Sequence, residues 1–259
     1  MGVLYIKVFL YILLYALLGV VGIFLLAILF LTVVALTIPP KKLYDRESPF
    51  YRGVLNFFTG AALFVLRVKV KIEGADKLPD DTNFLFISNH CSNYDPIVQW
   101  YALRKYRISF VSKAANFRVP WFGGIIRKCC FMPIDRKSPK RSMDTINRAA
   151  KLLKETENCV GVYPEGTRSK SCKLLPFHSG VLKIAQKAEK PLVVAVVKGT
   201  ERIAKNLLRF RCSQVVIQII ETMDAAQVCS MRSSELGEYT RSLMDKALKG
   251  EENEYIRSV

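Results

Sequence analysis

The most continuous feature of the sequence is an apolar run near its start. No charged residue occurs between Val8 and Pro40, and the stretch from Val8 to Ile38 is almost wholly apolar. A transmembrane helix needs about 20 such residues, whereas the apolar core of a secretory signal spans about 7–15. No small-residue cleavage site precedes Pro39, so the pattern predicts an uncleaved membrane anchor over residues 1–42. A buried core helix would have to be unusually long.

Two amphipathic segments follow the apolar run. Residues 49–66 mix aromatic and aliphatic side chains with Arg52 and Thr59, which predicts a helix at about 49–66 lying against the membrane or the domain. Val68 to Ile72 then alternates strictly between apolar residues and lysines, the period of a half-buried strand.

From residue 84 onward, short apolar runs alternate with helical patterns. This order is typical of an α/β sheet with helices on its faces, and we expect one such domain over residues 43–259. The charged tail from Gly250 is expected to fray. Strands are expected at 84–88, 107–111, 131–134, 160–163, 192–197 and 214–220, and helices at 96–105, 121–127, 140–157, 179–188 and 233–249.

The charge balance is strongly basic. Lysine and arginine outnumber aspartate and glutamate by 39 to 22, giving a formal net charge of +17. Residues 1–42 hold three lysines and no acid, which leaves +14 for the remainder. This excess favours an anionic partner such as nucleic acid, a membrane surface or a phosphorylated substrate. The predicted anchor and the lack of a stacking motif disfavour nucleic acid, and the basic residues after the anchor predict a cytoplasmic domain.

The cysteines show no metal or disulfide pattern. Their number is odd, no CxxC pair occurs, and the chain has only two histidines. We therefore expect no zinc site and no disulfide framework, and interpret the cysteines as small apolar residues in a reducing compartment. They occupy positions 91, 129, 130, 159, 172, 212 and 229.

The first segment with candidate chemistry follows the strand expected at 84–88. His90 lies five residues before Asp95, and Pro96 comes next. Aspartate before proline suits a helix start, so Asp95 could simply cap the helix. Alternatively, the loop turns back and Asp95 accepts a proton from one imidazole nitrogen, as in the His–Asp half of a hydrolase triad. No serine nucleophile is evident, so a hydroxyl of the substrate would attack.

A second candidate segment follows the strand expected at 160–163. It reads Tyr-Pro-Glu-Gly-Thr-Arg-Ser over residues 163–169. Gly166 permits a tight turn with positive φ, while Thr167 and Arg168 offer a hydroxyl and a bidentate guanidinium, which suit a phosphate. A solvated basic turn is the alternative.

Four segments, taken together and in order, resemble the glycerolipid acyltransferase family, of the 1-acylglycerol-3-phosphate acyltransferase type. The likeness covers about Leu66 to Lys205. Three positions depart from the family pattern: Cys130 where glycine is frequent, His178 where lysine is common, and Ala195 where a second proline is usual. These departures bear on donor and head-group preference. The four segments are Asn-His-x4-Asp at 89–95, a strand ending in arginine at 131–136, residues 163–169, and a proline-bearing apolar strand at 190–196.

The resemblance implies both a fold and a reaction. The fold would be α/β, with a mixed sheet flanked by helices. The reaction would move a fatty acyl group from a thioester to the sn-2 hydroxyl of lysophosphatidate, giving phosphatidate. Acyl-CoA or an acidic acyl-carrier protein would be the co-substrate, and no cofactor or metal is implied. Another lysophospholipid or glycerol 3-phosphate remains an alternative acceptor.

The resemblance also implies a role for each matched residue. His90 would take the hydroxyl proton as general base, and Asp95 would hold its tautomer and stabilise the imidazolium. Backbone N–H groups near His90 are candidates for binding the oxyanion. Arg168 is the first choice for the acceptor phosphate. Lys113 and Arg136 are supporting candidates that could instead be ordinary surface charges. Glu165 would orient Arg168 or bind the glycerol end. The remaining substrate-binding candidates are Gly166 and Thr167.

Two other classes of function stay open on the sequence. A membrane-tethered module that binds anionic lipid would show binding without turnover, and the His90–Asp95 pair argues against it because a binder needs no base. A thiol hydrolase using Cys91 with a histidine is the other alternative. Cys91 adjoins His90, but neighbouring residues in an extended loop point apart.

Overall fold

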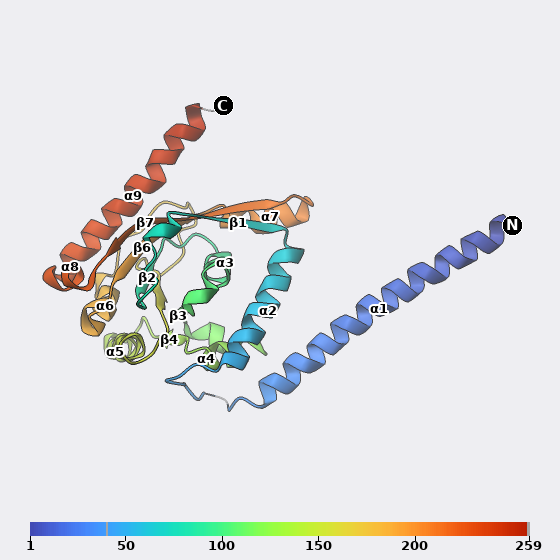
Figure 1. Cartoon of the computed structure of the whole chain (residues 1–259), viewed down its shortest axis with the longest axis horizontal. Coiled ribbons are helices and arrows are strands. Elements are labelled where there is room, and N and C mark those ends of the chain that lie inside the picture. The colour runs from blue at the N-terminus through green and yellow to red at the C-terminus, as the bar shows by residue number, and fades with distance from the viewer. Residues whose placement is uncertain (40, 258–259) are drawn as a thin grey trace.

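The computed structural model describes residues 1–39 and 41–257 and consists of a helix-flanked sheet with one long helix extending away from it (Figure 1). Pro40, where the predicted uncharged run ends, lies outside the described residues. The seven strands lie in the order β1-β7-β6-β2-β5-β3-β4. Their bounds are β1 Val68–Glu73, β2 Leu85–Ile87, β3 Ser109–Lys113, β4 Met132–Ile134, β5 Val160–Val162, β6 Leu192–Lys198 and β7 Ser213–Met223.

The sheet is mixed, as expected. Five neighbouring strands, from β6 to β4 in the sheet order, run parallel. Strand β7 is antiparallel to β6 and parallel to edge strand β1, so β1 and β7 run opposite to the other five strands. The carboxyl ends of the five parallel strands therefore meet at one edge, which is where open α/β sheets place their ligand sites.

Helices cover both faces of the sheet, because strand residues alternate between two cores. In β6, Val193 and Ala195 join the core under α2, α3 and α4, whereas Leu192 and Val194 join the core under α5, α6, α8 and α9. The helices are α1 Gly2–Leu36, α2 Pro49–Val65, α3 Tyr94–Ala102, α4 Phe122–Lys128, α5 Pro139–Glu155, α6 Lys183–Ala188, α7 Ile203–Leu208, α8 Ala225–Ser230 and α9 Ser233–Arg257.

Several predicted boundaries need correction. Helix α3 begins at Tyr94, two residues earlier than expected. The helix expected at 179–188 divides into a 3-10 turn, Ser179–Leu182, followed by α6. Helix α9 continues to Arg257 instead of ending at 249. The short helices α7 and α8 were not predicted, since six residues give too little periodicity to recognise.

Helix α1 contacts the domain only through its last turns. Of its residues, Leu31 and Val34 pack into the core beside α2, and Ile38 joins them just after the helix. The remainder projects away from the domain with its apolar side chains exposed (Figure 1). Residues Leu4–Leu36 are long and apolar enough to cross a membrane. This finding agrees in length and composition with the anchor predicted over residues 1–42.

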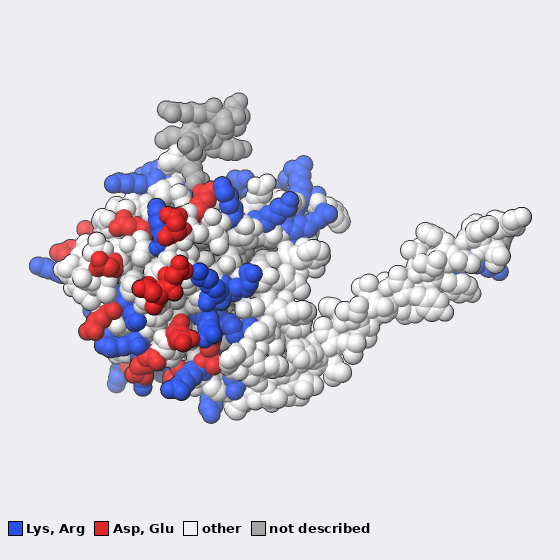
Figure 2. Space-filling model, viewed as in Figure 1, with Lys and Arg blue, Asp and Glu red and all other residues white. Residues whose placement is uncertain are grey.

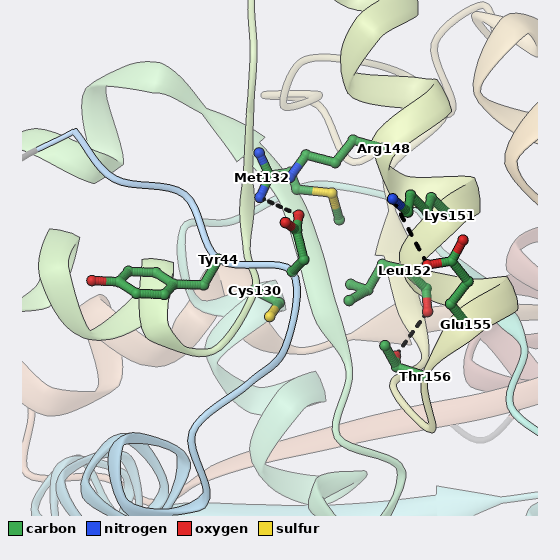
Figure 3. Close-up of a pocket in the computed structure, with 9 residues that line it drawn as sticks. Tyr44, Cys130, Met132, Arg148, Lys151, Leu152, Glu155 and Thr156 are labelled. Carbon is green, nitrogen blue, oxygen red and sulfur yellow. Dashed lines mark hydrogen bonds and ion pairs between the residues drawn. The ribbon is translucent and has the colours of Figure 1, made fainter.

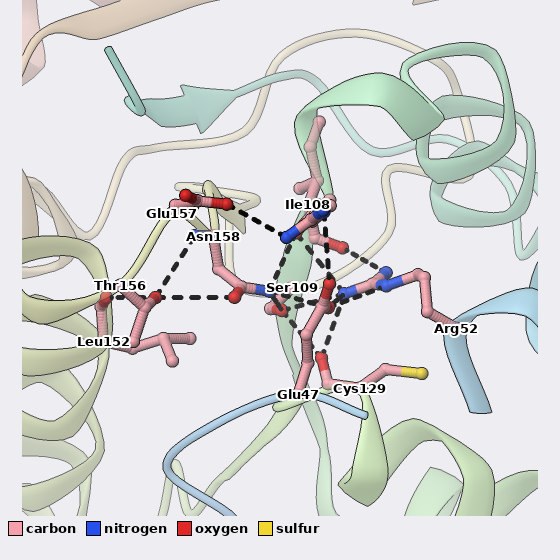
Figure 4. A network of polar contacts seen from close by, with 10 residues as sticks. Glu47, Arg52, Ile108, Ser109, Cys129, Leu152, Thr156, Glu157 and Asn158 are labelled. Atoms are coloured by element: carbon pink, nitrogen blue, oxygen red, sulfur yellow. Dashed lines mark hydrogen bonds and ion pairs between the residues drawn. The ribbon is translucent and has the colours of Figure 1, made fainter. Parts of the chain in front are cut away.

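A buried polar network ties the segment between α1 and α2 to the sheet (Figure 4). Arg52 on α2 donates to Oε2 of Glu47 at 2.6 Å, and both side chains are only 7% exposed. The Arg52 guanidinium also donates to the Ile108 carbonyl at 3.0 Å and to the Cys129 carbonyl at 3.1 Å. Asn158 donates to the same Glu47 oxygen at 2.8 Å. The network fixes the start of α2 against strand β3.

A small hollow lies on the other side of this segment, against α5 (Figure 3). Tyr44, Cys130 and Arg148 are among the residues that line it, and Arg148 pairs with Asp45 at 2.7 Å. Its volume is about 20 Å³, room for about one water molecule. This hollow is therefore too small to hold a substrate.

Candidate active site

The predicted site residues gather at one edge of the sheet, and the strand order explains why. His90 follows β2, Lys113 ends β3, Arg136 follows β4, and residues 163–168 follow β5. These four strands are parallel neighbours, so their carboxyl ends lie side by side. The segments far apart in sequence are thereby brought around one cavity.

The His90–Asp95 pair forms with close geometry. Nδ1 of His90 lies 2.8 Å from Oδ2 of Asp95, whose side chain is fully buried. An ionised carboxylate only accepts hydrogen bonds, so Nδ1 carries the proton and Nε2 is left as the acceptor. The His90 side chain is 16% exposed and lines the cavity. This is the arrangement that a general base requires.

The capping interpretation of Asp95 is not what the structure shows. Asp95 lies in the first turn of α3, and its Oδ2 accepts the backbone N–H groups of Cys91 at 2.7 Å and Ser92 at 2.8 Å. These amides belong to the preceding loop, not to the helix. The hydroxyl of Thr200, which follows β6, donates to Oδ1. The Asp95 carboxylate therefore has two roles: it folds the His90 loop back, and it orients the imidazole.

Glu165 holds two loops together. Its side chain is buried and absent from the cavity lining. Oε1 accepts the N–H of His90 at 2.7 Å, and Oε2 accepts the N–H of Leu175 at 2.9 Å. Burial raises the pKa of Glu165, and these two hydrogen bonds oppose that shift. In the structure Glu165 thus positions the His90 loop, and its role in substrate binding stays a prediction.

The backbone N–H groups nearest to His90 are already engaged. Those of His90, Cys91 and Ser92 donate to Glu165 or Asp95. These three N–H groups are therefore not available to bind an oxyanion, which narrows the candidates named from the sequence. Charge that develops on the substrate must be stabilised by other groups that line the cavity.

An aromatic stack supports the imidazole from one side. The ring of Tyr163 lies parallel to that of His90, with centroids 4.2 Å apart and an interplanar angle of 15°. The Tyr163 hydroxyl donates to Oε1 of Gln99 at 2.6 Å. Burial raises the pKa of Tyr163 well above its ordinary value, so the phenol stays neutral. Sequence reasoning assigned no role to this ring.

The cavity in front of His90 measures about 710 Å³. Its polar wall carries the predicted residues Lys113, Arg136, Gly166, Thr167 and Arg168. Its apolar wall is built by Trp100, Phe110, Phe122, Ile126, Phe131 and Ile134. The cavity thus offers both cations that suit an anionic group and apolar side chains that suit a hydrocarbon chain, and His90 is among its lining residues.

Gly166 is required by both backbone and packing. Its φ is +65°, in the left-handed region that favours glycine. A Cβ added there would lie 2.8 Å from Cδ2 of His178, which also lines the cavity. The turn therefore brings His178, the position where the family commonly has lysine, against the phosphate-binding candidates.

The thiols are poorly suited to nucleophilic catalysis. Burial raises the pKa of Cys91 far above its ordinary value, and burial also raises the pKa of Cys172. The thiolate is the reactive form, so both are inert at neutral pH. Within residues 1–39 and 41–257, no group of three or more His, Cys, Asp or Glu side chains is placed to hold a metal ion.

Comparison with known proteins shows which family the sequence matches. The family profile described as Acyltransferase matches residues 69–198. The 1-acyl-sn-glycerol-3-phosphate acyltransferase of Bacillus subtilis is 30% identical over 73% of this chain and 90% of its own length. The protein of the same name from Escherichia coli is 24% identical, over 80% of this chain and 83% of its own.

A solved structure shares the fold. The crystal structure of the 1-acyl-sn-glycerophosphate acyltransferase PlsC from Thermotoga maritima superposes with a TM-score of 0.63 at 23% identity, covering 78% of this chain and 79% of that one. The profile match spans β1 to β6 and includes both His90 and Asp95. The chain belongs to the acyltransferase family.

Proposed function

We propose that the protein transfers a fatty acyl group from a thioester to the sn-2 hydroxyl of lysophosphatidate, giving phosphatidate in phospholipid synthesis. The observation that carries this proposal is the His90–Asp95 pair, whose imidazole lines a cavity that is also lined by cationic and by apolar side chains. The relatives named as 1-acyl-sn-glycerol-3-phosphate acyltransferases support the choice of acceptor.

The reaction follows from the hydrogen bonding of His90. Nε2 accepts the proton of the acceptor hydroxyl as the oxygen attacks the thioester carbon. Asp95 stabilises the resulting imidazolium through Nδ1. The carbon–sulfur bond then breaks, and the leaving thiolate takes the proton from Nε2 of the imidazolium, which restores neutral His90. A thiolate is a good leaving group, so no covalent acyl-enzyme is needed, consistent with the neutral thiol of Cys91.

The cationic wall suits the acceptor phosphate. Arg168 follows the Gly166 turn, and its guanidinium can form a bidentate pair with a phosphate. Lys113 and Arg136 line the same cavity from neighbouring strands and would add charge without the fork geometry. The aromatic and aliphatic wall would hold an acyl chain, because burial of hydrocarbon is favourable there.

The membrane role of α1 is part of the proposal. Its apolar length supports an anchor, single-pass or lying in one leaflet, with the catalytic domain over residues 43–259 on the cytoplasmic side. The acceptor and product are lipids, so a tethered enzyme need not extract them far from the leaflet. We propose acyl-CoA or acyl-carrier protein as the donor, without a further cofactor.

A turnover assay of the full chain in detergent tests the proposal. Lysophosphatidate, glycerol 3-phosphate and lysophosphatidylglycerol would each be offered with acyl-CoA and with acyl-carrier protein. We expect the highest kcat/KM for lysophosphatidate. Binding of these lipids with no product from any donor would instead favour a lipid-binding module.

A further inference from the structure

Some of the most exposed apolar side chains of the domain lie at the end of α7, at the far end of the sheet from α8 (Figure 1). Leu208, the last residue of α7, is 83% exposed, and Phe210, in the turn that follows, is 84% exposed. We call residues 205–211 the α7 tip. Burying two such side chains in an apolar phase is favourable, so their exposure calls for a partner.

The tip is held rigidly to the junction between α2 and β1. The N–H groups of Arg209 and Arg211 donate to the Asn206 carbonyl at 3.0 and 2.8 Å, closing the turn. Arg67, at the junction, donates to the Phe210 carbonyl at 2.7 Å. These bonds fix the two apolar side chains in space relative to the end of α2.

The charge around the tip is of one sign. The tip carries Lys205, Arg209 and Arg211, and Arg67 lies beside it. No aspartate or glutamate occurs between residues 202 and 220 or between residues 48 and 72. Figure 2 shows basic side chains gathered over the α7 end of the molecule, whereas acidic and basic side chains mix over the rest of the visible face.

Helix α2 extends this surface toward α1. Phe50, Phe57 and Phe64 are exposed and are spaced by seven residues, so they share one side of the helix. The only charged residue of α2, Arg52, is buried on the opposite side. Helix α1 joins the domain near the start of α2, and the α7 tip lies at the end of α2 (Figure 1). The 17 residues between them span about 25 Å.

We propose that the α7 tip is a second membrane contact, separate from α1, that inserts Leu208 and Phe210 into an anionic leaflet. The surrounding arginines and lysine would meet lipid phosphates, for which basic residues flanking apolar ones are suited. A second copy of the chain is a poorer partner, because a two-fold contact would set the same cations against one another. Two contacts about one helix length apart would fix the rotation of the domain on the leaflet.

Two exposed native cysteines provide matched probes. Cys212 follows the tip directly, and Cys229 lies on α8 at the opposite end of the sheet (Figure 1). A polarity-sensitive fluorophore would be attached to Cys212 in the full-length Cys229→Ser variant, and to Cys229 in the Cys212→Ser variant. The raised pKa values of Cys91 and Cys172 slow their labelling, and mass spectrometry would verify the labelled site.

Both labelled proteins would be reconstituted in vesicles of phosphatidylcholine, with and without added phosphatidylglycerol. We expect the Cys212 probe to report an apolar environment and quenching by lipids labelled in the acyl chain, more strongly with phosphatidylglycerol present. The Cys229 probe should remain in water. Equal signals from the two probes, or a Cys212 signal that depends on protein concentration and not on lipid charge, would overturn the proposal.

Variants of the tip separate the protein's own contact from an effect of the fluorophore. Leu208→Ser with Phe210→Ser should abolish the Cys212 signal, and Arg209→Gln should reduce its dependence on anionic lipid. Arg232→Gln, next to α8, removes one charge away from the tip and should change neither. If the signal survived the double serine substitution, the fluorophore itself would be inserting and the tip would not be the contact.

Discussion

The hydroxyl of Thr200 donates a hydrogen bond to Oδ1 of Asp95, the oxygen that His90 does not use. Both side chains are buried, and they lie 105 residues apart in the sequence. They meet because β2 and β6 are parallel neighbours whose carboxyl ends share one edge of the sheet. Thr200 is therefore a positioning residue that acts on the base through Asp95.

Thr200→Val removes this hydrogen bond while keeping the side-chain shape. We expect kcat to fall about tenfold, corresponding to about 1.4 kcal/mol of transition-state stabilisation, with little change in KM. Thr200→Ser keeps the hydroxyl and should restore most of kcat. Steady-state kinetics of both variants would test this role. An equal loss of kcat in Thr200→Val and Thr200→Ser would mean that Thr200 contributes packing only.

Arg168 is expected to bind the acceptor phosphate, so its effect should depend on the acceptor. Arg168→Ala should raise KM for lysophosphatidate, and Arg168→Lys should also be impaired because it lacks the bidentate fork. The defect should shrink for a monoacylglycerol of the same chain length. The measurement is kcat/KM for each variant on both acceptors. The same fold-loss on the two acceptors would reassign the phosphate to Lys113 or Arg136.

The buried pair of Arg52 and Glu47 should matter for stability. Arg52→Ala removes the nearest cation from buried Glu47, which would keep only Asn158 and the more distant Arg107 at 3.6 Å. Breaking a buried pair in this way typically costs about 3–5 kcal/mol. Arg141→Ala breaks an exposed pair with Asp135 and should cost about 0–1 kcal/mol. Denaturant titration in detergent would compare them. If Arg52→Ala does not fold, the double variant Glu47→Gln with Arg52→Leu should recover folded protein, because it removes both buried charges. If the double variant also failed to fold, the loss of stability would come from other contacts in the network.

Cys91 should be dispensable for chemistry despite its place beside His90. Its pKa is raised by burial, so the thiol is neutral and a weak nucleophile at neutral pH. Cys91→Ala should keep kcat near that of the wild type, as should Cys172→Ala. A folded Cys91→Ala variant without turnover would revive a thiol-based mechanism.

Much of this architecture could be predicted from local pattern. The continuous apolar run of β6 and the long periodicity of α5 are local signals, and they placed both elements within a few residues. The pairing of His90 with Asp95 could also be predicted, because the two residues lie in one short segment. Local reasoning could not choose between capping and catalysis, since that depends on which amides the carboxylate meets.

The partners that come from distant segments could not be predicted. Tyr163 reaches His90, and Thr200 reaches Asp95, only through the strand order, and no local pattern reports that order. Glu165 was recognised as part of a motif, but its contacts with the His90 and Leu175 N–H groups could not be predicted. Its motif neighbours Gly166 and Arg168 line the cavity, whereas its own carboxylate turns inward to the N–H groups of His90 and Leu175.

The central claim is that His90 is the general base of acyl transfer, and His90→Ala tests it most directly. The imidazole lines the cavity and is not part of the core, so the variant should fold as the wild type does. Single-turnover measurement of acyl transfer to lysophosphatidate should show a rate lower by about 10²–10⁴-fold, with lysophosphatidate binding largely retained. A purified, folded His90→Ala protein that turned over near the wild-type rate would contradict the account.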